Sequence, residues 1–189
     1  MLLVSQNLLK YGMDFPPNTV LRINLAWVKD LDYLVNFLKK FDKDIFLDLP
    51  TGRTKPPNYR YNMEELKDIL NSHKNVKYFV ISNVETTSQI SDSYNFLSKN
   101  ITLVPKIESI VGIKNIKAIT DALREKEKIL MLDHDDLFAK ILKNGEPVDN
   151  FKIYIQKLVD YCDSNKVILL RTIGVMFSDE EKRISDYVN

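Results

Sequence analysis

Seven short segments rich in Val, Ile and Leu alternate along this chain with segments whose apolar residues recur every three or four positions. The short segments are residues 2–6, 19–26, 44–50, 77–84, 102–109, 128–134 and 166–172. The helical spacing marks residues 29–40, 62–73, 87–99, 112–125 and 150–164. Apolar strands separated by helices are typical of βαβ units, in which the strands are parallel. We therefore predict an α/β fold with about seven parallel strands, a TIM-type (β/α) barrel that is incomplete or compact.

Length and composition indicate a single globular domain over residues 1–189, with 44% hydrophobic and 28% charged residues. The net charge of +1 gives no reason to expect a nucleic-acid partner. One cysteine, Cys162, makes no intrachain disulfide and suits a reducing compartment. The sequence shows no leader peptide and no apolar run long enough for a membrane span. We expect a cytoplasmic protein without membrane association.

Polar side chains collect where the predicted strands end, which is the edge at which parallel α/β folds bind ligands. Lys106 and Glu108 lie two residues apart, so both side chains point to one face of their strand. We expect this face to open on a binding crevice. The residues predicted to line it are Arg22, Asn24, Asp48, Ser82, Lys106, Glu108, Asp136, Arg171 and Thr172.

Glu108 and Asp136 are the predicted metal ligands, because carboxylates at neighbouring strand ends can share Mg²⁺ or Mn²⁺. The alternative is a pair of solvated loop carboxylates. Lys106 beside them either stabilises an enolate or only forms an ion pair. The run 133–136 could form a richer metal cluster, but we expect Asp136 alone to point inward and its neighbours to be loop groups or groups that contact the metal ligands. Arg22, in an apolar strand, requires a partner such as Asp48 or a bound anion.

Six pieces of the chain, in the same order, resemble pyruvate kinase. "VLRINLAW" is similar to a strand with an R-x-N pattern, and "IFLDLPTGRTK" to Leu-Asp-x-Lys-Gly-Pro. "VKYFVISNVETTSQI" is similar to the family's fourth strand, with a serine at the place of Ser82. "LVPKIESIVGIKNIKAI" resembles Lys-Ile-Glu-Asn-x-x-Gly, and "ILMLDHDDL" resembles Met-Val-Ala-Arg-Gly-Asp-Leu. "EEKRISDYVN" is similar to Arg-Ala-Glu-x-Ser-Asp-Val-Ala-Asn.

The resemblance implies roles for particular residues. The family's divalent-metal carboxylates fall on Glu108 and Asp136, and its catalytic lysine falls on Lys106. The arginine that binds the transferring phosphate falls on Arg22. Asn24 and Asp48 match two ligands of the family's monovalent cation. The substrate would be pyruvate, phosphoenolpyruvate or a related 2-keto acid.

This sequence departs from the family at several positions. Ala26 and Leu49 replace two further cation ligands, which makes a monovalent cation doubtful. His134-Asp135 replaces Arg-Gly, and Arg171 stands where a threonine is expected, with Thr172 next. About a dozen residues follow the third strand, so the family's nucleotide-covering domain has no counterpart there.

Three functions follow from these observations. The first is a metal-dependent enzyme that stabilises an enolate of a 2-keto acid, as a pyruvate kinase-like transferase or as an aldolase or lyase. The second is a binding or regulatory module that keeps the pocket without catalysis. The third is a truncated barrel that serves in assembly. Because a seven-stranded parallel sheet leaves two edges to be covered, we also expect a homo-oligomer.

Overall fold

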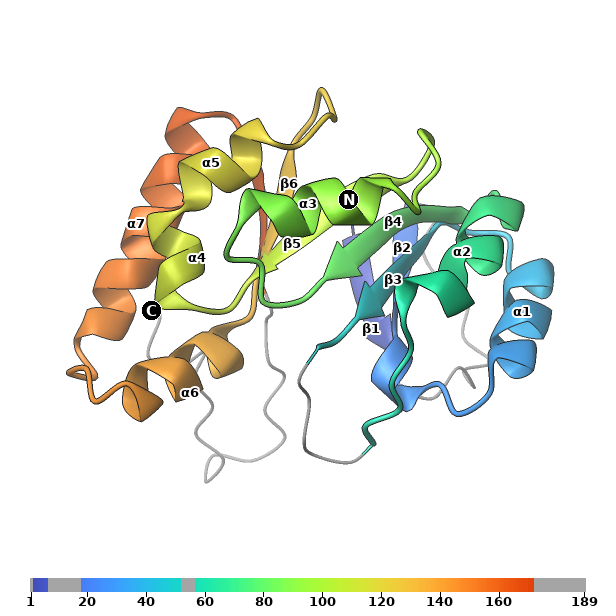
Figure 1. The fold of residues 1–189 in the computed structure, drawn as a ribbon, viewed down its shortest axis with the longest axis horizontal. Helices are drawn as coiled ribbons and strands as arrows, with labels where there is room; N and C mark the ends of the chain where they lie inside the picture. The colour runs from blue at the N-terminus through green and yellow to red at the C-terminus, as the bar shows by residue number, and fades with distance from the viewer. Residues whose placement is uncertain (1, 7–17, 52–56, 172–189) are drawn as a thin grey trace. The chain divides into compact units, whose positions relative to one another are not determined.

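The computed structural model of the chain describes residues 2–6, 18–51 and 57–171 (Figure 1). These residues form seven strands, seven α-helices and one short 3₁₀-helix. By their internal contacts they belong to two compact units. The first comprises Met1–Ser82 with Asp92–Leu103, and the second comprises Asn83–Ser91 with Val104–Asn189.

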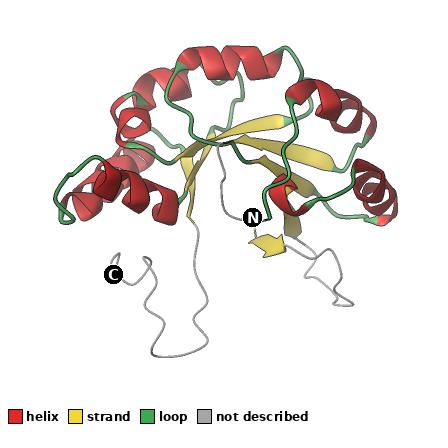
Figure 2. Ribbon diagram, turned by 60° about the horizontal axis from the view of Figure 1, so that its bottom comes forward, coloured by secondary structure: helices red, strands yellow, loops and turns green. Residues whose placement is uncertain are grey.

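The first unit contains four parallel strands that neighbour one another in chain order: β1 (Leu2–Gln6), β2 (Thr19–Asn24), β3 (Ile45–Leu49) and β4 (Val76–Ile81). The connections after β2 and β3 carry η1 (Leu25–Trp27), α1 (Leu31–Lys40) and α2 (Met63–Ser72). Helices α1 and α2 lie along the same face of these strands (Figure 2). Successive strands are therefore wound in one direction, without the reversal of strand order that defines a doubly wound sheet.

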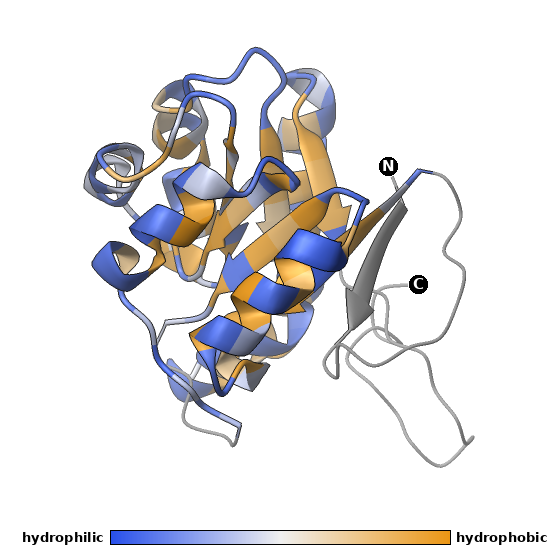
Figure 3. Ribbon diagram, turned by 90° about the vertical axis from the view of Figure 1, so that its right-hand side faces the viewer, coloured by the Kyte–Doolittle hydropathy of each residue, from blue (hydrophilic) through white to orange (hydrophobic). Residues whose placement is uncertain are grey.

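Local sequence signals set the ends of these two helices. Asp30 caps α1 by accepting a hydrogen bond from the backbone N–H of Asp32 at 2.9 Å. Asn62 and Glu65 cap α2 reciprocally, each side chain accepting from the other's backbone N–H. Strands β2 and β3 are almost wholly buried, and Figure 3 shows their hydrophobic character beside the polar outer surfaces of the helices.

The second unit contains three parallel strands in chain order: β5 (Thr102–Ile107, in this unit from Val104 on), β6 (Ile129–Leu132) and β7 (Ile168–Arg171). Its helices are α4 (Ile110–Lys114), α5 (Ile116–Asp121), α6 (His134–Lys143) and α7 (Asn150–Ser164). Helix α3 (Thr87–Tyr94) passes from the second unit into the first. The core of the second unit is formed by the apolar faces of β5 and β6 and by buried residues of α7 such as Phe151 and Leu158.

The predicted α/β class and the parallel strands are confirmed. The finer prediction, an incomplete or compact TIM-type barrel, is not shown, because the pairings of the described strands form an open sheet within each unit. Helix α6 was not predicted, since its acidic start was attributed to the end of the preceding strand. The predicted helix 112–125 is two helices that meet at Asn115, whose side chain donates to the backbone carbonyl of Glu85 at 2.8 Å.

Within the described part of the chain, none of the helices has the length and apolar character needed to cross a bilayer.

Candidate metal centre and strand-end residues

Lys106 and Glu108 form a buried ion pair at the carboxyl end of β5. Lys106 Nζ lies 3.0 Å from Glu108 Oε1, and the two side chains are 4% and 5% exposed. As predicted from their spacing, both leave the same face of the strand. Among the described residues, the Lys106 ammonium group is the one donor beside Glu108 Oε1.

The turn that follows this pair explains why the chain has a serine and a glycine there. Ser109 caps α4, and its Oγ accepts from the backbone N–H of Gly112 at 3.1 Å. A Cβ on Gly112 would lie 2.6 Å from the backbone oxygen of Val84, so this position has no room for a side chain. The backbone N–H of Val84 in turn donates to the carbonyl of Lys106 at 3.1 Å. These contacts fix the end of β5 that carries the ion pair.

Two further carboxylates approach Glu108 from the start of α6. Asp133 is the N-cap of α6, and its Oδ1 accepts from the backbone N–H of Asp136 at 3.3 Å. One carboxylate oxygen each from Glu108, Asp133 and Asp136 lie within 4.8 Å of one another. Glu108 is buried, Asp133 half-buried and Asp136 exposed, so the group opens toward solvent on one side. We refer to Glu108, Asp133 and Asp136 as the acidic triad.

Asp133 is the member of the acidic triad that the sequence analysis did not favour. The prediction gave this role to Glu108 and Asp136 and kept Asp133 in a metal cluster only as the alternative. Strand register provides the missing signal. Lys106 lies opposite Met131 on β6, so Asp133, two residues later, returns to the face that carries Lys106 and Glu108.

The acidic triad shifts the protonation of its own members. Burial is the main cause that raises the pKa of Glu108 to about 7; the Lys106 charge opposes this, and Asp136 and Asp133 add to it. Burial also raises the pKa of Asp136, followed by the charge of Asp133, while Lys106 and Lys140 act in the opposite direction. Near pH 7, the protonated and ionised forms of Glu108 are therefore present in comparable amounts.

The donor set fits a hard divalent cation. Mg²⁺ and Mn²⁺ prefer carboxylate oxygens and retain several waters, and the acidic triad offers three carboxylates with an open side. Glu108 Oε1 is engaged by Lys106 at 3.0 Å, so a cation bound by the acidic triad would share this carboxylate with the ammonium group. A bound cation would also offset the repulsion from Asp136 and Asp133, which adds to the effect of burial on the pKa of Glu108.

Lys140 connects α6 to the segment that follows β4. Its Nζ donates to Oδ1 of Asn83, a residue held in the left-handed region at φ 55°. Gln89 Nε2 donates to the backbone carbonyl of Asn83 at 3.1 Å. Lys140 lies one helical turn after Asp136, so this contact helps to hold the exposed member of the acidic triad in place.

Four of the predicted residues lie on one face of the first unit's sheet. Arg22 and Asn24 lie two residues apart on β2, so their side chains leave the same face. Asp48 on β3 lies opposite Asn24. Val80 on β4 lies opposite Asp48, and Ser82 comes two residues after Val80. Arg22 Nε donates to Asp48 Oδ2 at 3.0 Å, and Nη2 donates to the same oxygen. Asp48 is fully buried and Arg22 is 8% exposed. The partner predicted for Arg22 is therefore present.

Asn24 has a structural task in this unit. Its Oδ1 accepts from the backbone N–H of Ala26 at 3.0 Å and caps η1. The Asn24 oxygen and the Asp48 carboxylate, both expected from the resemblance to bind a monovalent cation, thus already have partners in the protein. Ser82 Oγ is buried and makes no hydrogen bond.

Arg171 lies apart from the face that carries Lys106 and Glu108. It pairs in register with Leu132, which pairs with Ile107, so these three side chains share the opposite face of the sheet. There the Arg171 guanidinium contacts the ring of His134, with Nε and Nη2 each 3.4 Å from Nε2. Thr172 lies outside the described residues.

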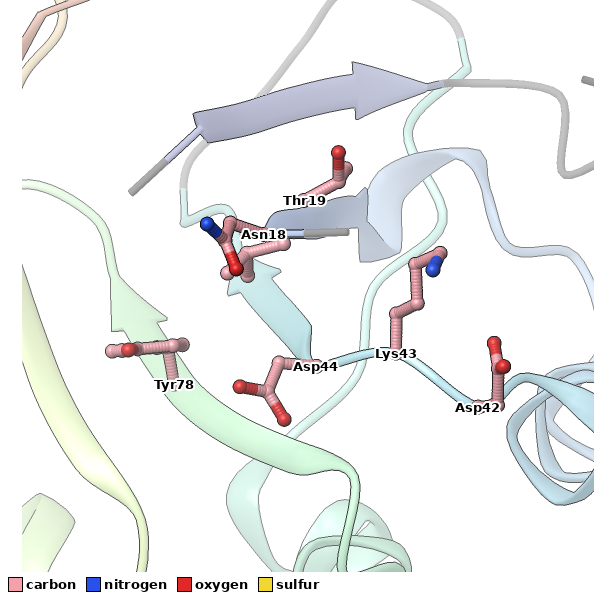
Figure 4. A pocket seen from close by; sticks show the side chains of 7 residues that line it. Asn18, Thr19, Asp42, Lys43, Asp44 and Tyr78 are labelled. Atoms are coloured by element: carbon pink, nitrogen blue, oxygen red, sulfur yellow. The ribbon is translucent and has the colours of Figure 1, made fainter. Parts of the chain in front are cut away.

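Two surface hollows contain none of the predicted residues. The first, of about 410 Å³, lies at the amino ends of β2 and β3 (Figure 4) and is lined by Asn18, Thr19, Val20, Asp42, Lys43, Asp44 and Tyr78. The second, of about 220 Å³, lies beside the amino ends of β6 and β7 in the second unit. Amino ends of parallel strands serve stability more than ligand binding.

No known protein family and no curated protein matches the chain.

Proposed function

We propose that this protein is a divalent-metal-dependent enzyme that acts on pyruvate or phosphoenolpyruvate-type 2-keto acids by stabilising an enolate. The observation that carries the proposal is the acidic triad beside Lys106, with oxygens within 4.8 Å of one another and the ammonium group 3.0 Å from Glu108. Three carboxylates suit Mg²⁺ or Mn²⁺, and a fixed cation beside them suits an anionic intermediate.

The chemistry follows from charge. Removal of a proton from C3 of a 2-keto acid, or loss of CO₂ from a carboxylate on C3, leaves the electron pair of the broken bond shared between C3 and the keto oxygen. A divalent cation held by Glu108, Asp133 and Asp136 would supply Lewis-acid stabilisation of that oxygen. Lys106 contributes a second positive charge that burial shields from water, which strengthens its effect on a nearby anion. Glu108 balances Lys106 when no substrate is present.

The overall architecture that we propose is a pyruvate kinase-like barrel. Parallel strands in chain order and polar side chains at their carboxyl ends support it. The sequence resemblance assigns Arg22 to phosphate binding. A lyase or aldolase reaction agrees better with the short segment after β3 than phosphoryl transfer to a nucleotide does.

A second candidate function is a binding or regulatory module without turnover. It is favoured by the first unit, where Asp48 is engaged by Arg22 and Asn24 caps η1. Those residues would then hold the fold, and only the acidic triad and Lys106 would meet a ligand.

Exchange of the methyl protons of pyruvate in D₂O, followed by NMR, tests the proposal directly because exchange requires an enolate. We expect exchange with the full chain and Mg²⁺, none after EDTA treatment, and at least ~10-fold slower exchange in Lys106→Met. Lys117→Met is the matched control, since Lys117 is an exposed lysine paired with Asp121 in the same unit. Metal and pyruvate binding without exchange would favour the second candidate function. The absence of both binding and exchange would contradict both candidate functions.

A further inference from the structure

Among the residues that the structure describes, Arg171 has His134 as its side-chain partner, and this partner carries no negative charge. Its guanidinium directs Nε and Nη2 at His134 Nε2, each at 3.4 Å. Within residues 2–6, 18–51 and 57–171, no carboxylate forms an ion pair with Arg171. Arg22 shows the contrast, because Asp48 neutralises it within the first unit.

His134 holds the guanidinium without compensating its charge. The imidazole is 4% exposed, and its edge packs on the ring of Phe151 in α7, with ring centroids 6.4 Å apart at 75°. The contact with both N–H groups of one guanidinium edge requires a ring nitrogen that accepts, as in neutral histidine.

Over the described part of the chain, the guanidinium keeps donors for a ligand. The imidazole uses the edge formed by Nε and Nη2, and no described residue bonds to the edge formed by Nη1 and the outer hydrogen of Nη2. Arg171 is exposed at the end of β7, so a small molecule can reach it. Planar, bidentate contact with a carboxylate or phosphate is the geometry for which an arginine side chain is best suited.

The start of α6 lies beside this arginine. His134 is the first residue of α6, and the partial positive charge at the amino end of this helix is opposed by Asp133, Asp135 and Asp136 in its cap and first turn. Register places Arg171 on the face of Ile107 and Leu132, away from that of Lys106 and Glu108. The position is thus separate from the acidic triad and does not require a metal.

We propose that Arg171, positioned by His134, is a binding site for the carboxylate or phosphate group of a small molecule. Arg171 contacts the anion, and His134 is a positioning residue. The neutral imidazole fixes one edge of the guanidinium, so the other edge is already oriented when the anion arrives, which lowers the entropic cost of binding.

NMR titration of the ¹⁵N-labelled full chain with inorganic phosphate, and separately with acetate, tests the site in the presence of EDTA. We expect the Arg171 Nε–H resonance to shift in a saturable way with at least one probe. The probe that binds more tightly identifies phosphate or carboxylate as the preferred group. Arg171→Met should weaken binding by about tenfold or more, as expected for a lost hydrogen bond to a charged group. Arg124→Met, which removes the same charge elsewhere in the second unit, should have no effect.

Two variants of His134 test positioning. His134→Phe keeps an aromatic ring on Phe151 but removes the acceptor, so it should weaken binding, whereas His134→Gln should restore part of the affinity through its amide oxygen. Glu108→Gln should leave binding unchanged. Loss of binding in Glu108→Gln, dependence on added Mg²⁺, or no saturable shift with either probe would overturn the inference. The absence of a saturable shift in EDTA would leave the metal affinity of the acidic triad untouched, so failure of this inference and failure of the proposed function are distinguishable.

Discussion

Arg22 donates to Asp48 from Nε at 3.0 Å across two adjacent strands, and neither side chain has appreciable contact with water. The geometry makes each residue depend on the other, because a buried charge without its partner is costly.

Arg22→Met should therefore destabilise the protein by about 3–5 kcal/mol, measured by urea unfolding of the full chain. Asp48 would be left buried without its partner, while the methionine fills much of the same volume. The double variant Arg22→Met with Asp48→Leu should recover most of the loss. If Arg22→Met alone were as stable as the unmodified chain, the pair would not be structural.

Gly112→Ala tests the turn that orients Lys106 and Glu108. The added methyl group would lie 2.6 Å from the backbone oxygen of Val84, which cannot rotate away as a side chain can. We expect a loss of about 1–3 kcal/mol, as for an overpacked core site. Val111→Ala, at an exposed position in the same helix, is the control for helix propensity. Equal stability of the two variants would contradict the close approach.

The pH dependence of metal affinity tests the pKa of Glu108. Since this pKa is about 7 without metal, affinity for Mg²⁺ should fall by roughly tenfold per pH unit below 7 and level off above it.

The contribution of Glu108 to the stability of the metal-free chain should fall, not rise, as the pH increases. The folded state keeps a proton that the unfolded state releases above 4.5, so this group's contribution to stability declines as pH rises from about 4.5 to 7. Calorimetry at several pH values measures the first effect and urea unfolding the second. A pH-independent affinity between 6 and 8 would contradict metal binding by a Glu108 whose pKa is about 7.

Lys106→Met should reduce the affinity for oxalate, an enolate analogue, by about tenfold in the presence of Mg²⁺. Its stability should change little near neutral pH, because Glu108 can take up a proton when the ammonium group is removed. Lys117→Met provides the control for loss of a lysine. A large drop in melting temperature with unchanged oxalate affinity would mean that Lys106 serves only the fold.

The strands were predictable because Val, Ile and Leu runs identify parallel strands wherever they occur, and the shared face of Lys106 and Glu108 followed from alternation alone. The pairing of each strand with its neighbours, and the register of that pairing, were not predictable. The face of Arg171 is set by its pairing with Leu132, and the inward turn of Asp133 is set by Met131 opposite Lys106. Both depend on register between segments far apart in the chain, which spacing within one segment does not contain.

Helix α6 was missed for a local reason. Asp133, Asp135 and Asp136 resemble a polar loop, whereas they are the acidic cap and first turn of a helix whose apolar residues, Leu137 and Ile141, come later. The break at Asn115 was missed because Ile113, Ile116 and Ile119 continue the helical spacing across it.

The measurement that tests the central claim most directly is calorimetric titration of Mn²⁺ into the full chain at pH 8, compared with Glu108→Gln. Glu64→Gln is the control, because Glu64 is an exposed residue of α2 outside the acidic triad. We predict one saturable site in the unmodified chain and in Glu64→Gln, and at least ~10-fold weaker binding in Glu108→Gln. Equal affinity in all three proteins, or no saturable binding in any, would contradict a metal centre built on Glu108, Asp133 and Asp136.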